Sequence, residues 1–229
     1  MSLRFFADIL GPPTRAVMVL MDKEAVPYDY VFINLAKAET KTNPELAAVN
    51  PCKKVPAIDD KGFGLWESAA ILKYLVRAYN LPSHWYPEDV QKRARVDQYL
   101  AWHQGNIRNG LCFNMVIAPS RGIKVPEGKV KQLKTDMKKG LEVLENYFLS
   151  GEGPFMCGSE MTIADLQAVC ELTQFWITHS PIEDSWPKIG KWVGACIDYL
   201  GEPFTKAHKT ILDMKEEGKF KAEVKWDDV

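Results

Sequence analysis

The sequence has no long apolar run and no excess of charge of either sign. Its apolar stretches fall short of the ~20 residues that span a bilayer. The first six residues lack the apolar core and cleavage site of a secretory signal. The formal net charge of -1 gives no extended field for a nucleic acid or an anionic membrane. We therefore expect neither of these partners.

Cysteine and histidine are scarce and dispersed. The five cysteines form no C-x-x-C pair, which argues against a disulfide framework and against structural zinc. The four histidines have no carboxylate or cysteine partner at a useful spacing, so no metal is expected. Reduced, mostly buried thiols in the cytoplasm fit this pattern. The cysteines are Cys52, Cys112, Cys157, Cys170 and Cys196.

The pattern of secondary-structure signals along the chain changes near residue 80. Before it, strand and helix signals alternate in the order β-α-β and then β-β-α, which is typical of a small mixed sheet with one antiparallel hairpin. After it, strand signals vanish, and we predict domains over 1–80 and 89–229. Strands are expected over 3–9, 28–33, 55–58 and 64–66. Helices are expected over 14–25, 67–79, 89–119, 127–149, 163–178, 186–200 and 203–214, with a weak helix or turn over 43–49.

Val55-Pro56 stands immediately before a short expected strand. A proline cannot donate to a sheet ladder, so it belongs at the first position of that strand. If the Val55–Pro56 peptide bond is cis, the backbone groups of Val55 point outward and can pair with an extended, peptide-like ligand as one more strand. An ordinary trans proline entering an edge strand is the alternative.

Glu67-Ser68 marks the junction between a strand and a helix. The Ser68 hydroxyl and the N–H groups of the helix start form an anion site, favoured by the positive end of the helix dipole. Glu67 offers a carboxylate to an ammonium group, so the pair matches a zwitterion such as an α-amino acid terminus. A capping serine beside a solvated glutamate is the alternative.

Longer segments carry a family resemblance. Residues 50–57 (NPCKKVPA) and 65–75 (LWESAAILKYL) resemble the glutathione-binding half of the cytosolic glutathione transferases. Residues 85–87 (WYP) and 94–103 (ARVDQYLAWH) are similar to the theta class. Residues 161–165 (MTIAD) resemble the buried N-capping box of these proteins, in which Thr162 caps a helix and Asp165 answers it. The likeness extends from residue 2 to about residue 214.

The resemblance implies a fold and a set of site residues. The fold is a thioredoxin-like α/β N-terminal domain that binds glutathione, followed by an all-α helical domain that forms the hydrophobic acceptor site. A symmetric homodimer is also implied. Val55 would bond the cysteinyl backbone of glutathione, Glu67 and Ser68 would hold its γ-glutamyl end, and lysines would neutralise its glycyl carboxylate. The glutathione-binding residues that the resemblance implies are Lys41, Lys54, Val55, Pro56, Glu67 and Ser68. Each lysine can alternatively be an ordinary surface charge.

One departure from the family pattern concerns catalysis. A thiol with a pKa of ~8.5 is little ionised at pH 7, so the enzyme must stabilise the thiolate of glutathione. The theta class uses a serine in a pattern like Ser-x-Pro-Cys-Arg, where this chain reads GPPTR over residues 11–15. Gly11 has no hydroxyl, and Ala7 replaces the tyrosine that serves as the other common donor. We predict that Thr14, or the adjacent helix end, lowers the thiol pKa with help from Arg108. Purely local bonding of Thr14 is the alternative.

These observations favour an enzyme. The expected reaction transfers the glutathione thiol to small, electrophilic hydrophobic compounds, a detoxification reaction. Because the usual serine and tyrosine are absent, a non-catalytic binding or structural module of the same fold is the alternative. Reduction of organic hydroperoxides by the same thiolate, a glutathione peroxidase activity, is a third hypothesis.

Overall fold

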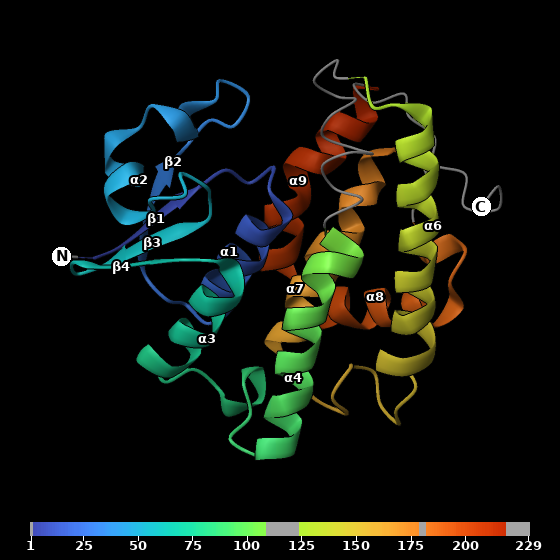
Figure 1. Cartoon of the computed structure of the whole chain (residues 1–229). Coiled ribbons are helices and arrows are strands. Elements are labelled where there is room, and N and C mark those ends of the chain that lie inside the picture. The colour runs from blue at the N-terminus through green and yellow to red at the C-terminus, as the bar shows by residue number, and fades with distance from the viewer. Residues whose placement is uncertain (1, 109–123, 179–181, 219–229) are drawn as a thin grey trace.

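The computed structural model describes residues 2–108, 124–178 and 182–218. A four-stranded sheet of order β2-β1-β3-β4 forms the first half, and the second half is helical (Figure 1). Strand β1 runs parallel to β2 and antiparallel to β3, and β3 and β4 form a hairpin. The elements of the first half are β1 (Leu3–Ala7), α1 (Pro12–Lys23), β2 (Tyr28–Phe32), α2 (Pro44–Val49), β3 (Ala57–Asp60), β4 (Phe63–Trp66) and α3 (Ser68–Ala78).

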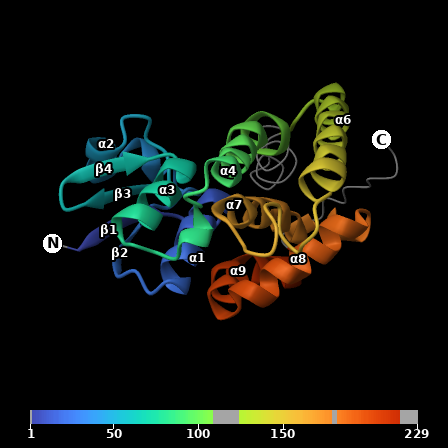
Figure 2. The same cartoon turned by 90° about the horizontal axis from the view of Figure 1, so that it is seen from below.

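The central strand β1 is buried on both faces of the sheet, and its side chains alternate between these faces. Phe5 belongs to the core shared with α1 and α3, whereas its neighbour Phe6 packs with Ile33 and Leu46 on the side of α2. Figure 2 shows the resulting layers, with α2 on one side of the sheet and α1 and α3 on the other. The predicted α/β class of this half is confirmed.

The second half is arranged around α7, every residue of which is buried. This helix packs against α1, α4 and α8, so it joins the two halves of the molecule. None of the helices in the described ranges is long and apolar enough to cross a membrane. The helices of this half are α4 (Val90–His103), α6 (Glu127–Val143), α7 (Ile163–Leu172), α8 (Pro187–Leu200) and α9 (Glu202–Glu216).

Several predicted boundaries differ from the structure for local reasons. The first strand ends at Ala7, because the carboxylate of Asp8 accepts hydrogen bonds from the N–H groups of Leu10 (3.0 Å) and Leu35 (2.9 Å) and turns the chain. The helix predicted to reach residue 178 ends at Leu172 and continues as a 3-10 turn. Here the hydroxyl of Thr173 donates to the carbonyl of Val169 at 2.6 Å, a bond that bends a helix.

Two other helices end in π-helical turns. Helix α4 continues as Gln104–Arg108, and α6 continues as Leu144–Phe148. The part of the first long helix predicted over 109–119 lies outside the described residues. The expectation of mostly buried thiols is wrong for Cys52, which is exposed in the turn before β3, whereas Cys170 and Cys196 are buried.

The predicted capping box at the start of α7 is confirmed. The carboxylate of Asp165 accepts hydrogen bonds from the N–H (2.9 Å) and the hydroxyl (2.8 Å) of Thr162. It also accepts from the N–H of Met156 (2.8 Å) and the indole N–H of Trp192 (2.9 Å). Burial raises the pKa of Asp165, and these four donors act against that rise. One fully buried carboxylate thus holds α7, the preceding loop and α8 together.

Candidate functional site

The two motifs singled out in the sequence lie side by side at the margin of the sheet. In the β3–β4 hairpin, Ala57 pairs with Trp66. The residues just outside this pair are Pro56 on one strand and Glu67 on the other, so the hairpin register brings them together. The Val55–Pro56 bond is cis, which is the conformation that the strand-addition hypothesis assumes. The margin therefore offers extended backbone next to a helix start.

Ser68 is the first residue of α3 and lies beneath the surface. It is 2% exposed, and its hydroxyl has no hydrogen-bond partner among the described residues. Glu67, just before it, is exposed and has a φ of 71°. Such a φ strains a residue with a side chain, and strained backbone is often found at functional sites. The buried hydroxyl and the exposed carboxylate stand at the positive end of the α3 dipole.

The loop before Pro56 is held by one buried amide. The side chain of Asn50 accepts from the N–H of Cys52 at 2.9 Å and donates to the carbonyl of Lys54 at 2.8 Å. Lys54 itself is exposed beside Val55, and Lys41 is exposed in the 3-10 turn Glu39–Lys41. Both ammonium groups are thus available to an anion, and Lys54 is adjacent in sequence to the cis bond.

Thr14 lies in the first turn of α1, directly after the loop between β1 and α1. Its hydroxyl is fully buried and has no hydrogen-bond partner among the described residues. A side chain built on Gly11 would begin 3.4 Å from this oxygen. The Thr14 hydroxyl therefore adjoins the space that a serine at position 11 would enter.

The backbone of the α1 N-terminus offers little to a ligand. Pro12 and Pro13 have no N–H, and the N–H groups of Thr14 and Arg15 both donate to the carbonyl of Gly11, at 3.0 and 3.1 Å. The N–H of Gly11 donates to the carbonyl of Asp8 at 3.0 Å. Two donors were predicted for the thiolate. The N–H groups of the helix end already donate to backbone carbonyls, whereas the Thr14 hydroxyl has no partner among the described residues.

Comparisons with known proteins identify the family to which this fold and these motifs belong. The family model "Glutathione S-transferase, N-terminal domain" matches residues 1–77, and "Glutathione S-transferase, C-terminal domain" matches residues 112–198. Human glutathione S-transferase theta-2B is 38% identical to this chain, over 95% of the chain and 90% of the relative. This chain belongs to the glutathione S-transferase family. Arabidopsis thaliana glutathione S-transferase T1 is 33% identical over 94% and 91%, respectively.

Solved structures of theta-class glutathione transferases share the whole fold. Human theta-2 in complex with glutathione and an unknown ligand superimposes with a TM-score of 0.87 at 37% identity, over 94% of this chain and 90% of that one. A human theta-class enzyme in complex with the glutathione conjugate of 1-menaphthyl sulfate gives a TM-score of 0.86 at 38% identity, over 95% and 90%. The predicted theta-class resemblance, and the thioredoxin-like plus helical fold, are confirmed.

Arg108, the remaining predicted catalytic residue of this transferase, is the last residue of the π-helical turn that follows α4. It is half-buried, on a different half of the molecule from Thr14. The residues that follow it, 109–123, lie outside the described ranges. The structure thus brings Val55, Pro56, Glu67 and Ser68 to one margin, whereas Arg108 belongs to the helical half, at the end of the turn that follows α4.

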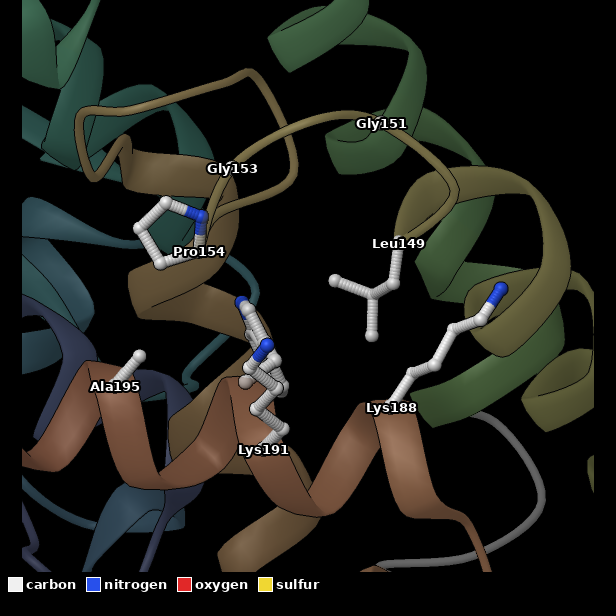
Figure 3. A pocket seen from close by; sticks show the side chains of 8 residues that line it. Leu149, Gly151, Gly153, Pro154, Lys188, Lys191 and Ala195 are labelled. Atoms are coloured by element: carbon white, nitrogen blue, oxygen red, sulfur yellow. The ribbon is translucent and has the colours of Figure 1, made fainter.

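A cavity of about 500 Å³ lies elsewhere in the helical half, between the loop after residue 148 and α8 (Figure 3). Leu149 and Pro154 line it together with Lys188 and Lys191. None of the residues assigned to glutathione lines it, so this cavity is not the candidate site.

Sequence reasoning missed two buried polar residues behind the β1–α1 loop, Asp8 and Arg15. The structure shows Asp8 to be 2% exposed and Arg15 to be 0% exposed. The available signal was Arg15, which directly precedes the apolar run 16–21. Because charged residues are rarely buried without partners, an arginine beside a core segment indicates buried partners for its guanidinium. Their contacts span up to 193 positions of the chain.

Proposed function

We propose that this chain conjugates the thiol of glutathione to small, electrophilic hydrophobic compounds. The N-terminal part, residues 1–80, binds glutathione, and residues 89–229 supply the hydrophobic acceptor site. This proposal is supported by membership of the glutathione S-transferase family and by the buried hydroxyls of Ser68 and Thr14, neither of which has a hydrogen-bond partner within the described ranges. The main observation in support of glutathione binding is the hydroxyl of Ser68, which is buried at a helix start without a partner among the described residues.

Glutathione lies along the sheet margin in this proposal. Its cysteinyl backbone pairs with Val55, as a strand pairs with a sheet edge. The α-carboxylate of its γ-glutamyl end accepts from Ser68 at the start of α3, and its ammonium group faces the carboxylate of Glu67. Lys54 and Lys41 neutralise the glycyl carboxylate. These contacts direct the thiol toward the β1–α1 loop and Thr14.

The chemical step is a nucleophilic displacement. The thiol loses its proton to solvent, and the Thr14 hydroxyl donates a hydrogen bond to the thiolate, with the positive charge of Arg108 assisting. The thiolate attacks the electrophilic carbon and forms the C–S bond, while the leaving group departs with the electron pair of the broken bond. A thiolate ready at neutral pH is what the protein adds to the uncatalysed reaction.

The proposal is tested by retention on immobilised glutathione followed by a conjugation assay with a chloronitrobenzene acceptor. We expect both retention and turnover. Retention without turnover would instead support the non-catalytic module, and turnover with organic hydroperoxides alone would support a peroxidase. We also propose that the protein is a symmetric homodimer and that it is located in the cytoplasm. Gel filtration with light scattering measures the oligomeric state.

We expect Thr14→Ala to raise the pKa of the bound glutathione thiol by about 1.5 units, since a hydrogen bond to a charged group contributes about 2 kcal/mol. Affinity for glutathione should change little, because Thr14 does not face the γ-glutamyl end. The thiolate absorbance of bound glutathione, titrated against pH, measures the shift. An unchanged titration curve would remove Thr14 from the mechanism.

We expect Gly11→Ser to raise the conjugation rate near pH 7 by about tenfold, because a second hydroxyl lowers the thiol pKa further. Gly11 has a φ of -83° and a ψ of 121°, which a serine adopts without strain. In the background of Thr14→Ala, the same substitution should restore most of the lost activity. If the serine changes neither the rate nor the thiol pKa in either background, position 11 does not face the thiol.

A further inference from the structure

Arg15, the residue after Thr14, has a fully buried side chain in α1. Its guanidinium faces the β1–α1 loop through one nitrogen: Nη1 donates to the carbonyl oxygens of Ile9 at 3.0 Å and of Leu10 at 3.3 Å. These two residues and Gly11 are the chain that leads into α1. The carboxylate of Asp8 holds the N–H of Leu10 at 3.0 Å, so the loop is fixed through its N–H and its carbonyl groups.

The other two nitrogens of the guanidinium face the helical half. Nη2 donates to the carbonyl of Cys170, near the end of α7, at 2.9 Å and to the side-chain oxygen of Gln174 at 2.7 Å. Nε donates to Nε2 of His208 in α9 at 3.2 Å. One planar group therefore joins the β1–α1 loop to three segments that follow it by more than 150 positions, and its rigid fork suits such a multiple contact.

The histidine partner is held in the form that accepts this bond. Nδ1 of His208 lies 2.9 Å from the carbonyl of Phe204, which fixes the proton on Nδ1 and leaves Nε2 as the acceptor for Arg15. Thr173 adds a hydroxyl 3.0 Å from Nε2, and that hydroxyl donates to Val169. Burial, and then the charge of Arg15, lower the pKa of His208 well below its usual value, so the ring is neutral near pH 7.

We propose that Arg15 is a positioning residue of the conjugation reaction. Its guanidinium fixes the carbonyl groups of Ile9 and Leu10 against the helical half, and so sets where the Thr14 hydroxyl stands relative to the glutathione thiol. This inference rests on the proposed function and adds a residue that does not touch the substrate. The first turn of α1, which this loop leads into, carries the thiolate donor, and the helical half carries the acceptor site, so the guanidinium aligns the two reactants.

The test compares Arg15→Lys with the wild-type protein and with Arg77→Lys, which exchanges an exposed arginine of α3. Lysine keeps the charge and loses the fork. We expect the thiol pKa of bound glutathione to rise by about one unit and kcat near pH 7 to fall about tenfold in Arg15→Lys. The Kd for glutathione should change less than about threefold, because the γ-glutamyl and glycyl contacts are untouched. Arg77→Lys should match the wild type.

A second variant covers the case in which Arg15→Lys does not fold. Gln174→Met removes one acceptor of Nη2 from the helical side and leaves the loop and Arg15 in place. It should shift the thiol pKa and kcat in the same direction by a smaller factor. A folded Arg15→Lys protein with wild-type thiol pKa and kcat, or a Gln174→Met protein unchanged in both, would overturn the positioning role alone. A wild-type protein that binds glutathione without lowering its thiol pKa would overturn the proposed mechanism as well.

Discussion

Ser68→Ala is expected to weaken glutathione binding about 30-fold, since a hydrogen bond to a charged group contributes about 2 kcal/mol. The hydroxyl is 2% exposed and lacks a partner among the described residues, so a ligand carboxylate is the acceptor that it suits. In the absence of glutathione the variant should be at least as stable as the wild type, because a buried hydroxyl without a partner costs free energy. Titration calorimetry and thermal unfolding without ligand measure the two quantities.

Thr14→Ala is the matched control for this prediction, because Thr14 also carries a buried hydroxyl without a partner among the described residues. The two variants should change different quantities. Ser68→Ala lowers affinity and leaves the thiol pKa of bound glutathione unchanged, whereas Thr14→Ala does the reverse. If Ser68→Ala binds glutathione as the wild type does, or unfolds at a clearly lower temperature without ligand, the hydroxyl serves the fold and not the ligand.

Asp165→Asn is expected to lower the free energy of unfolding by roughly 3 kcal/mol or more. The carboxylate accepts four hydrogen bonds, two of them on each oxygen. An amide keeps one acceptor oxygen and turns an NH2 group toward two of these donors, which then stay buried and unsatisfied. Equilibrium unfolding in urea measures the loss as a lower midpoint at unchanged slope.

Asp198→Asn is the control for that experiment. Asp198 is exposed on α8, the helix that also carries the Trp192 donor. A surface substitution of this kind changes stability by no more than about 0.5 kcal/mol. Should Asp165→Asn lose no more stability than this control, the capping box is not what joins α7 to the preceding loop and to α8.

Much of the fold could be predicted because its signals are local. The strand and helix order of the first half follows from hydrophobic periodicity and from breakers such as Gly11-Pro12-Pro13. The start of α7 at Ile163 follows from Thr162 and Asp165, three positions apart. The helix ends were less predictable, because the hydroxyl of Thr173 bends the chain only where Val169 has already placed its carbonyl.

The meeting of the two motifs at the sheet margin could be predicted for the same reason. Val55-Pro56 and Glu67-Ser68 flank a single hairpin, so a local register brings them together. The site residues carried over from the family pattern stay predictions until the variants above are measured. The strained φ of Glu67 left no mark on the sequence, since glutamate is an ordinary residue at a helix start.

The arrangement behind the β1–α1 loop could not be predicted. Arg15 contacts residues as distant as His208, and a separation of 193 positions leaves no periodic signal. The position of the Thr14 hydroxyl next to Gly11 also depends on the fold. It follows from a turn in which the N–H groups of Thr14 and Arg15 both donate to the carbonyl of Gly11. Packing between the two halves therefore fixes the β1–α1 loop, through the hydrogen bonds of Arg15 to Ile9 and to Cys170.

The most direct measurement is a calorimetric titration of the wild-type protein with glutathione and, separately, with cysteinylglycine, the same peptide without its γ-glutamyl head. Recognition of that head by Ser68 and Glu67 predicts that glutathione binds and that the dipeptide binds at least about 30-fold more weakly. Equal affinities for the two peptides, or no binding of glutathione at all, would contradict the account.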